Sequence, residues 1–154
     1  MSPRSIAAVC AIAALLLNIA VERVLMGVAS SFTVIPGLAD FHPAWNRGVS
    51  FSLLSQNTDS GRYVLIAALA AITLVVGFVA WRAPTRLSGA GYGLILGGAL
   101  GNLADRTLYG GVFDFLYLHL GTLPLFVCNF ADIAISAGVV VLVVESVLPK
   151  PRLT

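Results

Sequence analysis

Charged residues are scarce in this chain of 154 residues. Only 10% of them are Asp, Glu, Lys or Arg, while 58% are hydrophobic and the mean hydropathy is +0.95. A water-soluble domain carries about a quarter of its residues as charged side chains. So few charges do not cover a water-facing surface, and the composition therefore indicates an integral membrane protein. The net charge of +2, with no block of Lys or Arg, excludes a nucleic-acid partner.

Cysteine is rarer still, with two residues, and their positions argue against a metal site and a disulfide framework. Cys10 and Cys128 lie in or beside apolar runs, with neither metal-ligand spacing nor the pattern of a disulfide framework. We interpret both as small buried side chains. The sequence also contains no low-complexity segment and no internal repeat, and its length favours a single membrane domain over residues 1–154.

Long hydrophobic runs are what the chain does have. Four of them approach the roughly 20 residues that a helix needs to cross a bilayer. They cover residues 5–21, 63–81, 87–104 and 130–148. The first run has the alternative interpretation of a cleaved signal peptide, but its Ala-x-Ala site is poor. The sequence predicts an all-α integral membrane protein with four transmembrane helices.

An even number of spans puts both termini on one side of the membrane. The connections 31–61 and 105–128 then share the other side. Lys and Arg slightly favour the side of the termini, five residues (Arg4, Arg82, Arg86, Lys150, Arg152) against four (Arg23, Arg47, Arg62, Arg106). This bias predicts cytoplasmic termini. Most acidic side chains fall on the opposite side, so the outer membrane boundary is where we expect the chemistry.

Glycines in the third run indicate how the helices pack. Gly89, Gly93, Gly97 and Gly101 recur every four residues and so share one helix face. Small residues at this spacing allow helix backbones to approach closely in lipid. We interpret this face as a packing surface.

Two aspartates on the outer side are the candidate catalytic residues. Asp132 begins the fourth apolar run, three residues after Asn129, and Asp114 lies in the connection before it. An ionised carboxylate costs several kcal/mol within hydrocarbon. Two carboxyl groups at close range share one proton, so that one serves as a base and the other as an acid. Such a pair suits attack of water on an amide, although a proton-coupled transporter also uses carboxylates in helices.

Four ordered motifs resemble those of the lipoprotein signal peptidases, or signal peptidase II family, which are bacterial inner-membrane aspartyl proteases with four transmembrane helices. Asn46-Arg47-Gly48-Val49-Ser50-Phe51 matches the family's loop motif, and Gly101, Asn102, Asp105 and Arg106 match Gly-Asn-x-x-Asp-Arg. Val112, Asp114 and Phe115 match Val-x-Asp-Phe, and Asn129, Ala131 and Asp132 match Phe-Asn-x-Ala-Asp, with Cys128 in place of Phe.

The resemblance implies roles for these residues. Asp114 and Asp132 correspond to the catalytic dyad. The residues that correspond to positions lining the site and binding substrate are Asn46, Gly48, Asn102, Asp105, Arg106 and Asn129. The connection 31–61 corresponds to a small strand-containing extracytoplasmic cradle. The implied substrate is a prolipoprotein whose cysteine carries diacylglycerol, and the cut falls just before that cysteine. We expect the enzyme to be a monomer in contact with membrane lipids. The resemblance implies no metal and no organic cofactor.

One departure from the family pattern lies late in the first apolar run. The family usually has Asp-Gln-x-x-Lys there, whereas this chain has Asn18 at the Asp position and Glu22 four residues later. This difference removes one charge and reverses another, which affects the expected substrate fit. A proton-coupled carrier and a non-catalytic relative are the two alternative functions. A carrier is expected to hold its carboxylates near the midplane, and a non-catalytic relative is expected to have a damaged dyad.

Overall fold

The structure is a computed structural model that describes residues 1–48 and 59–148. Val49, Ser50 and Phe51 of the loop motif, and the basic residues Lys150 and Arg152, therefore lie outside the described residues. The elements follow the order α1 (Pro3–Leu25), β1 (Phe32–Ile35), β2 (Ala39–Asn46), α2 (Asp59–Trp81), α3 (Arg86–Tyr109), β3 (Val112–Leu120), β4 (Leu123–Cys128) and α4 (Phe130–Val147).

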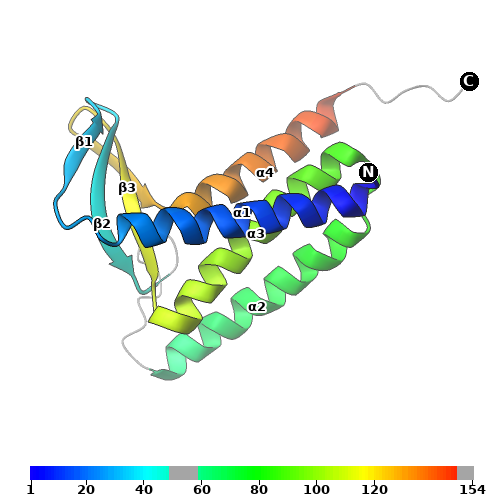
Figure 1. Ribbon diagram of the computed structural model, residues 1–154, viewed down its shortest axis with the longest axis horizontal. Helices are drawn as coiled ribbons and strands as arrows, with labels where there is room; N and C mark the ends of the chain where they lie inside the picture. The colour runs from blue at the N-terminus through cyan, green and yellow to red at the C-terminus, as the bar shows by residue number, and fades with distance from the viewer. Residues whose placement is uncertain (49–58, 149–154) are drawn as a thin grey trace, which may run out of the picture.

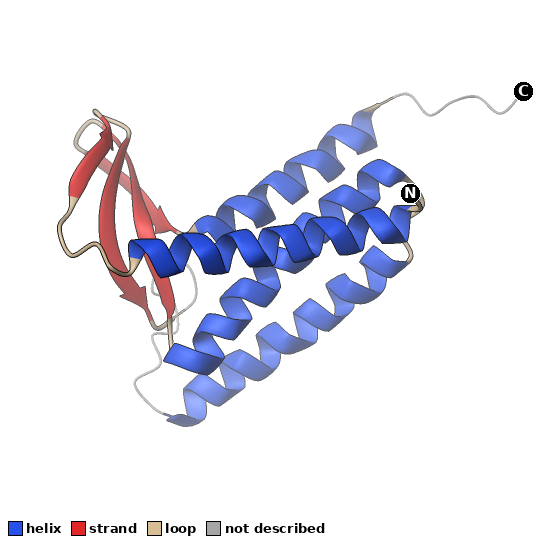
Figure 2. Cartoon of the chain, in the orientation of Figure 1, coloured by secondary structure: helices blue, strands red, loops and turns tan. Residues whose placement is uncertain are grey.

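The helices form a bundle, and all of the described strands lie at one end of it (Figures 1 and 2). The start of α1 and the end of α4 lie together at the opposite end (Figure 1). Of the helices that the structure describes, three are long and apolar enough to cross a membrane, namely α1, α2 and α4. The observed architecture is thus four helices, three of them candidate membrane spans, with a four-stranded antiparallel sheet.

Local sequence signals explain where the helices begin. Ser2 caps α1, and Pro3 follows it at the first helical turn, where its missing N–H costs nothing. Thr85 and Ser88 form a reciprocal capping box at the start of α3. Gly110, with φ of 76°, ends α3 in the left-handed conformation that glycine adopts without strain.

The central helix α3 is the least apolar of the four, and its position explains why. It packs against α1, α2 and α4. A Cβ at Gly93 or Gly97 would lie 2.4 Å from a backbone oxygen of α1, and one at Gly98 would lie 2.5 Å from the Ala131 oxygen of α4. The predicted glycine face is therefore confirmed as the surface on which α1 packs. Because neighbouring helices cover it, α3 does not need large apolar side chains.

The sheet is larger than the sequence predicted. We expected strands in the connection 31–61 and a loop over 105–128. Instead, α3 continues to Tyr109, and β3 and β4 then form a hairpin that turns at Gly121 (φ 59°). The strand order is β1-β2-β3-β4. Residues 112–120 form a strand because the side chains of VFDFLYLHL can alternate between the two faces of a sheet, as successive side chains of a β-strand do.

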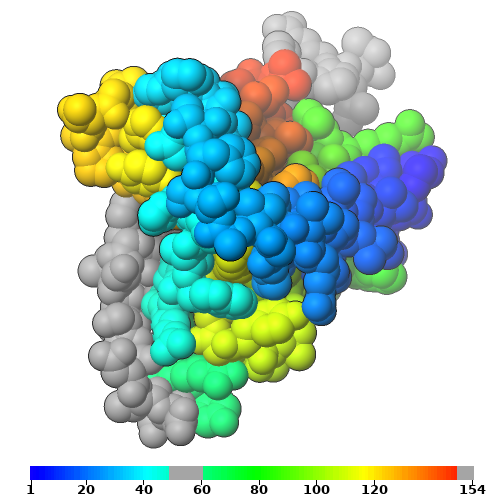
Figure 3. Space-filling view, turned by 60° about the vertical axis from the view of Figure 1, so that its left-hand side comes forward, coloured from blue at the N-terminus to red at the C-terminus, as the bar shows by residue number. Residues whose placement is uncertain are grey.

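The sheet is anchored on the C-terminal end of α1. Phe41, Phe113 and Phe115 form a buried cluster that packs against Val21 and Leu25, among other apolar residues. Figure 3 shows β1, in light blue, and β2, in cyan, beside the end of α1, in blue. Phe113 and Phe115 are used in this contact, so the alternate residues of β3, which include Asp114, face the other way. This packing places Asp114 on the side of the sheet that faces the remaining helices.

Candidate active site

Asp114 reaches the site from near the start of β3. Its side chain is 4% exposed, and Ala44 of β2 is its partner in the antiparallel register. Pro43, which has no N–H to donate to the ladder, coincides with a shift of this register between Phe41 and Ala44. The shifted register leaves Asn46 close enough for its Nδ2 to donate to Asp114 Oδ2 at 2.9 Å.

Asp132 is held by the first turn of α4. Asn129 caps this helix, because its Oδ1 accepts from the Asp132 N–H at 2.9 Å. In return, Asp132 Oδ2 accepts from the Asn129 N–H at 3.3 Å. This capping box explains how the chain tolerates a carboxylate at the start of an apolar helix, where the helix dipole also stabilises negative charge.

Two asparagine amides connect the aspartates. Asn129 Nδ2 donates to Asp114 Oδ1 at 2.8 Å and to Asn102 Oδ1 at 3.0 Å. Asn102 Nδ2 in turn donates to Asp132 Oδ1 at 2.9 Å. Residues of β3, α3 and α4 thereby form one hydrogen-bonded chain. Asn129 is fully buried, so its amide has no water with which to replace these partners.

The two aspartates differ in environment. Burial raises the pKa of Asp114 above its ordinary value, and the nearby negative charge of Asp132 acts in the same direction. The amides of Asn46 and Asn129 oppose this shift because they donate to the carboxylate form. Asp132 is less buried than Asp114. Asp114 therefore retains a proton more readily than a solvent-exposed aspartate.

Arg106 connects α3 to the loop motif that follows β2. Its Nη2 donates to the carbonyl of Gly48 at 2.9 Å, and its Nη1 donates to the carbonyl of Asn102 at 3.2 Å. The Gly48 N–H donates to Asn46 Oδ1 at 3.0 Å. Arg106 and Asn46 thus hold residues 46–48, the described part of the loop motif, next to the aspartates.

A cavity of about 940 Å³ opens beside these groups. Asp114, Asp132 and the polar residues around them form one part of its wall. Apolar side chains of α2, α3 and α4 form another part, among them Leu69, Val76 and Ile135. The cavity therefore joins a polar region containing both carboxyl groups to an apolar region within the bundle.

Seven of the eight predicted site residues line this cavity. They are Asn46, Gly48, Asn102, Arg106, Asp114, Asn129 and Asp132. Asp105, which was expected to bind substrate, does not line it. Its side chain instead contacts Glu22 of α1 and accepts from the Phe113 N–H. Asp105 and Arg106 are consecutive on a helix, so they point in directions about 100° apart.

Some contributors to the site were missed from the sequence. Helix α2 contributes four side chains to the cavity wall, those of Leu69, Ile72, Thr73 and Val76. In the sequence this segment predicts only an uncharged transmembrane helix. From the sequence, Arg62 was counted among the basic residues on the side opposite the termini. In the structure its Nη2 donates to the last carbonyls of α3, those of Arg106 and Thr107, at 3.2 Å. A basic residue opposite a helix C-terminus carries no signal in the sequence, because the two segments lie far apart in the chain.

The fold is similar to that of a solved bacterial membrane enzyme. A solved structure described as a bacterial membrane enzyme, determined by the in meso method at 2.3 Å resolution, superposes with a TM-score of 0.77. The match covers 96% of this chain and 93% of the solved one, at 19% sequence identity. At this identity the comparison establishes the fold.

Sequence comparisons identify the family. The profile described as signal peptidase (SPase) II matches residues 6–148. The lipoprotein signal peptidase of Methylorubrum extorquens is 49% identical over 116 residues, covering 74% of this chain and 67% of the relative. That of Nitrobacter hamburgensis is 36% identical over 160 residues, covering 98% and 97%, and that of Aquifex aeolicus is 34% identical over 144 residues, covering 93% and 86%. The chain belongs to the signal peptidase II family, whose members are aspartic peptidases of bacterial membranes.

Proposed function

We propose that Asp114 and Asp132 are the catalytic pair of this lipoprotein signal peptidase, which removes signal peptides from diacylglyceryl-modified prolipoproteins by cutting just before the lipid-bearing cysteine. The observation that carries this proposal is the chain of amides, Asn129 and Asn102, which holds both aspartates on the wall of one cavity. A rigid pair of carboxyl groups in different environments is the arrangement that general acid–base hydrolysis requires.

The two aspartates take different roles. Asp132, ionised and less buried, removes a proton from water, and the water oxygen attacks the scissile carbonyl carbon. Asp114, whose pKa burial raises, donates its proton to the carbonyl oxygen and so forms a gem-diol. Collapse of this intermediate breaks the C–N bond, and Asp132 passes the proton it gained to the leaving amine. A gem-diol proton returns to Asp114, which restores the starting state.

The surrounding polar groups position the reactants. Asn102 and Asn129 hold the carboxyl groups, and Asn46 donates to Asp114. The Arg106 guanidinium and Gly48 form the cavity wall next to the pair, where they bind the peptide backbone beside the lipid-bearing cysteine. No step of this reaction calls for a metal or an organic cofactor.

The cavity supports a lipidated substrate. Its apolar region is lined by side chains of three helices, and it is continuous with the region that holds the aspartates. Because such a surface is about as apolar as the lipid tails themselves, the acyl chains of diacylglycerol pass from the bilayer into it at little cost. A lipid on the cysteine therefore holds the substrate at the membrane and places the preceding peptide bond near Asp114 and Asp132.

The membrane arrangement follows from the same fold. We infer that α3 also spans, because it has 24 residues and lies between three apolar helices. Its side chains that would otherwise face lipid are partly covered by these neighbours. The chain then crosses the bacterial inner membrane four times as a single-domain monomer in contact with lipids. Its termini are cytoplasmic, and the sheet and the aspartates are at the outer face.

Cleavage of a lipidated substrate tests this function. The purified protein in detergent is incubated with a diacylglyceryl-modified prolipoprotein and, separately, with the unlipidated form. We expect only the lipidated form to be cut, with the new N-terminus at the modified cysteine by mass spectrometry. Equal cleavage of both forms would contradict the role of the lipid. An inert but folded wild-type protein would favour a non-catalytic relative or a proton-coupled carrier instead.

A further inference from the structure

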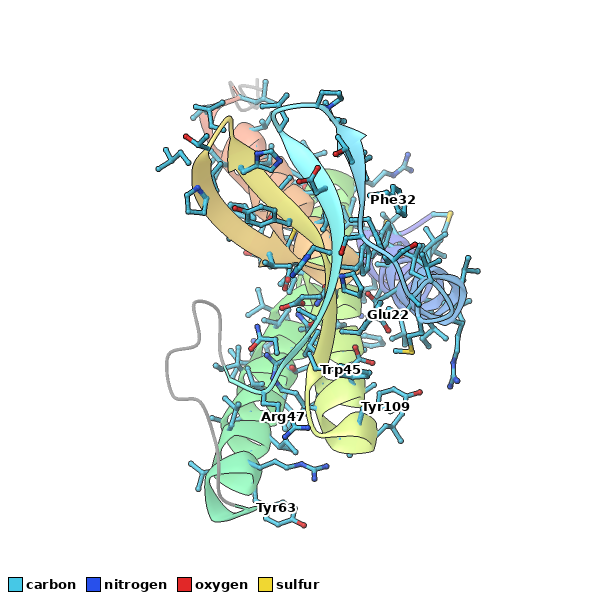
Figure 4. The ribbon with its side chains drawn as sticks, turned by 90° about the vertical axis from the view of Figure 1, so that its left-hand side faces the viewer. Glu22, Phe32, Trp45, Arg47, Tyr63 and Tyr109 are labelled. Atoms are coloured by element: carbon cyan, nitrogen blue, oxygen red, sulfur yellow. The ribbon has the colours of Figure 1, made fainter. Side chains whose placement is uncertain are left out.

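A second pair of carboxyl groups lies behind the active site. Glu22, at the outer end of α1, and Asp105, near the end of α3, are each 4% exposed. Their side chains are in hydrogen-bonding contact with each other. Figure 4 shows Glu22 on the side of α1 that faces the strands. Neither residue lines the cavity, and neither is used in the mechanism above.

The contacts of this pair leave an acceptor without a donor. Glu22 Oε1 accepts from Asn18 Nδ2 at 2.9 Å, and Asp105 accepts from the Phe113 N–H. Asp105 Oδ2 is buried, and no N–H or O–H of the described residues donates to it. A proton placed between the two carboxyl groups would supply the pair with a donor. Two ionised carboxylates at this distance and burial would instead repel each other without compensation.

Among the described residues, no Lys, Arg or His forms an ion pair with either carboxyl group. Arg106 follows Asp105 on α3, but its Nη1 and Nη2 donate to backbone carbonyls. Arg23 follows Glu22 and acts on Asp105 only through its charge. Asp114 of β3 adds a further negative charge near Glu22. The two arginines thus favour the charged form of Asp105 from a distance, Asp114 disfavours the charged form of Glu22, and neither arginine forms an ion pair with the two carboxyl groups.

The local packing is built around these side chains. Asn18 is fully buried, and it lies against Gly101 of α3, where an added Cβ would be only 2.9 Å from Asn18 Nδ2. Gly101 therefore makes the space that allows Asn18 to reach Glu22. This contact joins the position at which the chain departs from its family to the Gly-Asn-x-x-Asp-Arg motif.

We propose that Glu22 and Asp105 form a carboxylic acid–carboxylate pair that shares one proton and positions β3, and with it Asp114, against α1 and α3. The route is short, because Asp105 accepts from the N–H of Phe113, the residue before Asp114. Glu22 is thus a positioning residue. Glu22 stands where the family usually has a lysine. A protonated Glu22 donates a hydrogen bond to Asp105, whereas a lysine would place a positive charge beside it.

Infrared spectroscopy tests the shared proton without any assay of activity. The measurement uses the Asp114→Asn/Asp132→Asn protein in detergent, so that the catalytic pair contributes no carboxylic acid signal. We expect a C=O stretching band of a buried protonated carboxyl group at neutral pH. The additional substitution Glu22→Gln should remove this band. Glu145→Gln is the matched control, since Glu145 lies at the other end of the bundle, where it accepts from the Thr85 hydroxyl, and it should leave the band unchanged.

Activity measurements test the positioning role, and they rest on the function proposed above. Glu22→Gln keeps a donor toward Asp105 and an acceptor for Asn18, so we expect kcat within about threefold of wild type. Glu22→Ala removes both, and we expect kcat to fall at least tenfold with little change in KM. Rescue by Glu22→Lys, which replaces the proton by a charge, is expected to be at least partial.

The outcomes separate the two proposals. If the band is absent from the dyad-substituted protein, or survives Glu22→Gln, the shared proton is refuted whatever the enzyme does. If Glu22→Ala folds and has wild-type kcat, the positioning role is refuted. If Glu22→Ala does not fold, the kcat of Glu22→Gln decides, and a loss as large as tenfold would overturn the proposal. A wild-type enzyme that cuts nothing would refute the proposed function while leaving the infrared result to stand by itself.

Discussion

At the scale of single residues, Asn129 has two structural roles, one in capping a helix and one in holding an aspartate. Its Oδ1 caps α4, and its Nδ2 donates to Asp114 and to Asn102. Because the side chain is fully buried, loss of either task leaves polar groups without partners. Its position therefore couples the stability of α4 to the geometry of the proposed catalytic pair.

A pair of substitutions separates these tasks. Asn129→Ala should lower the free energy of unfolding by about 1 kcal/mol through the lost cap, and should lower kcat on the order of 10²-fold through the lost donor. Asn129→Ser keeps an oxygen for the cap, so we expect most of the stability to return while kcat stays low. Thermal unfolding in detergent and steady-state cleavage measure the two effects. Recovery of kcat in Asn129→Ser would show that the amide donor is not needed.

Asn46 tunes the protonation of Asp114. Its amide stabilises the carboxylate form and so lowers a pKa that burial raises. Removing this donor in Asn46→Ala raises the pKa of Asp114 further, and Asp114 then keeps its proton to higher pH. Because Asp114 is the acid of the proposed mechanism, the alkaline limb of kcat/KM should move to higher pH.

The pH profile of kcat/KM for Asn46→Ala, wild type and His42→Ala measures this shift. His42 is an exposed residue of the same strand, so its substitution should leave the profile in place. Movement of the acid limb in Asn46→Ala, instead of the alkaline limb, would assign the base to Asp114 and reverse the proposed roles. The raised pKa also means that Asp114 favours the folded state at low pH and that this contribution is lost as pH rises through the folded pKa.

At the scale of elements, glycines decide how close the helices approach. A Cβ at Gly97 would lie 2.4 Å from the Ala11 carbonyl oxygen, a contact with backbone that has no room to move. At Gly77 of α2 the nearest atom to an added Cβ is Leu96 Cδ1 at 3.7 Å, which is ordinary van der Waals contact. Replacing glycine by alanine would therefore cause a backbone clash at Gly97 and no clash at Gly77.

Gly97→Ala should destabilise the protein by about 1–3 kcal/mol, because it forces α1 away from α3. Gly77→Ala should be neutral or slightly stabilising, since alanine is the better helix former. Thermal unfolding of both variants in the same detergent makes the comparison. Equal unfolding temperatures would mean that the close approach of α1 and α3 is not required in the membrane protein.

A comparison of the sheet and the site with the expectations shows which features could be predicted from the sequence. Helical spacing paired Asn102 with Arg106 and Asn129 with Asp132, but only the family resemblance grouped the two pairs in one site. It did not separate Asp105 from Arg106, although consecutive helical residues diverge. The strands β3 and β4 were taken for a loop, even though Phe113 and Phe115 alternate with Val112 and Asp114. The partner of Glu22 was not readable, since it depends on how α1 packs on α3.

At the scale of the whole molecule, the proposed topology puts the sheet outside and the loop between α2 and α3 in the cytoplasm. Thr33→Cys in β1 and Pro84→Cys in that loop are exposed positions at opposite ends of the bundle. In a background with Cys10→Ala and Cys128→Ala, a membrane-impermeant maleimide applied to spheroplasts should label the first and not the second. Lysis should make the second reactive. Labelling of Pro84→Cys in intact spheroplasts would contradict cytoplasmic termini.

The central claim is that Asp114 and Asp132 together carry out the hydrolysis. The most direct test is cleavage of the diacylglyceryl-modified prolipoprotein by wild type, Asp114→Asn and Asp132→Asn side by side, each checked for its helical content and membrane insertion. Asparagine preserves the size of both side chains while removing the acid and the base. We predict that both variants insert normally and lose turnover, with cleavage at least 10³-fold slower, the scale on which essential acid–base groups act. Full turnover in either variant would contradict the account.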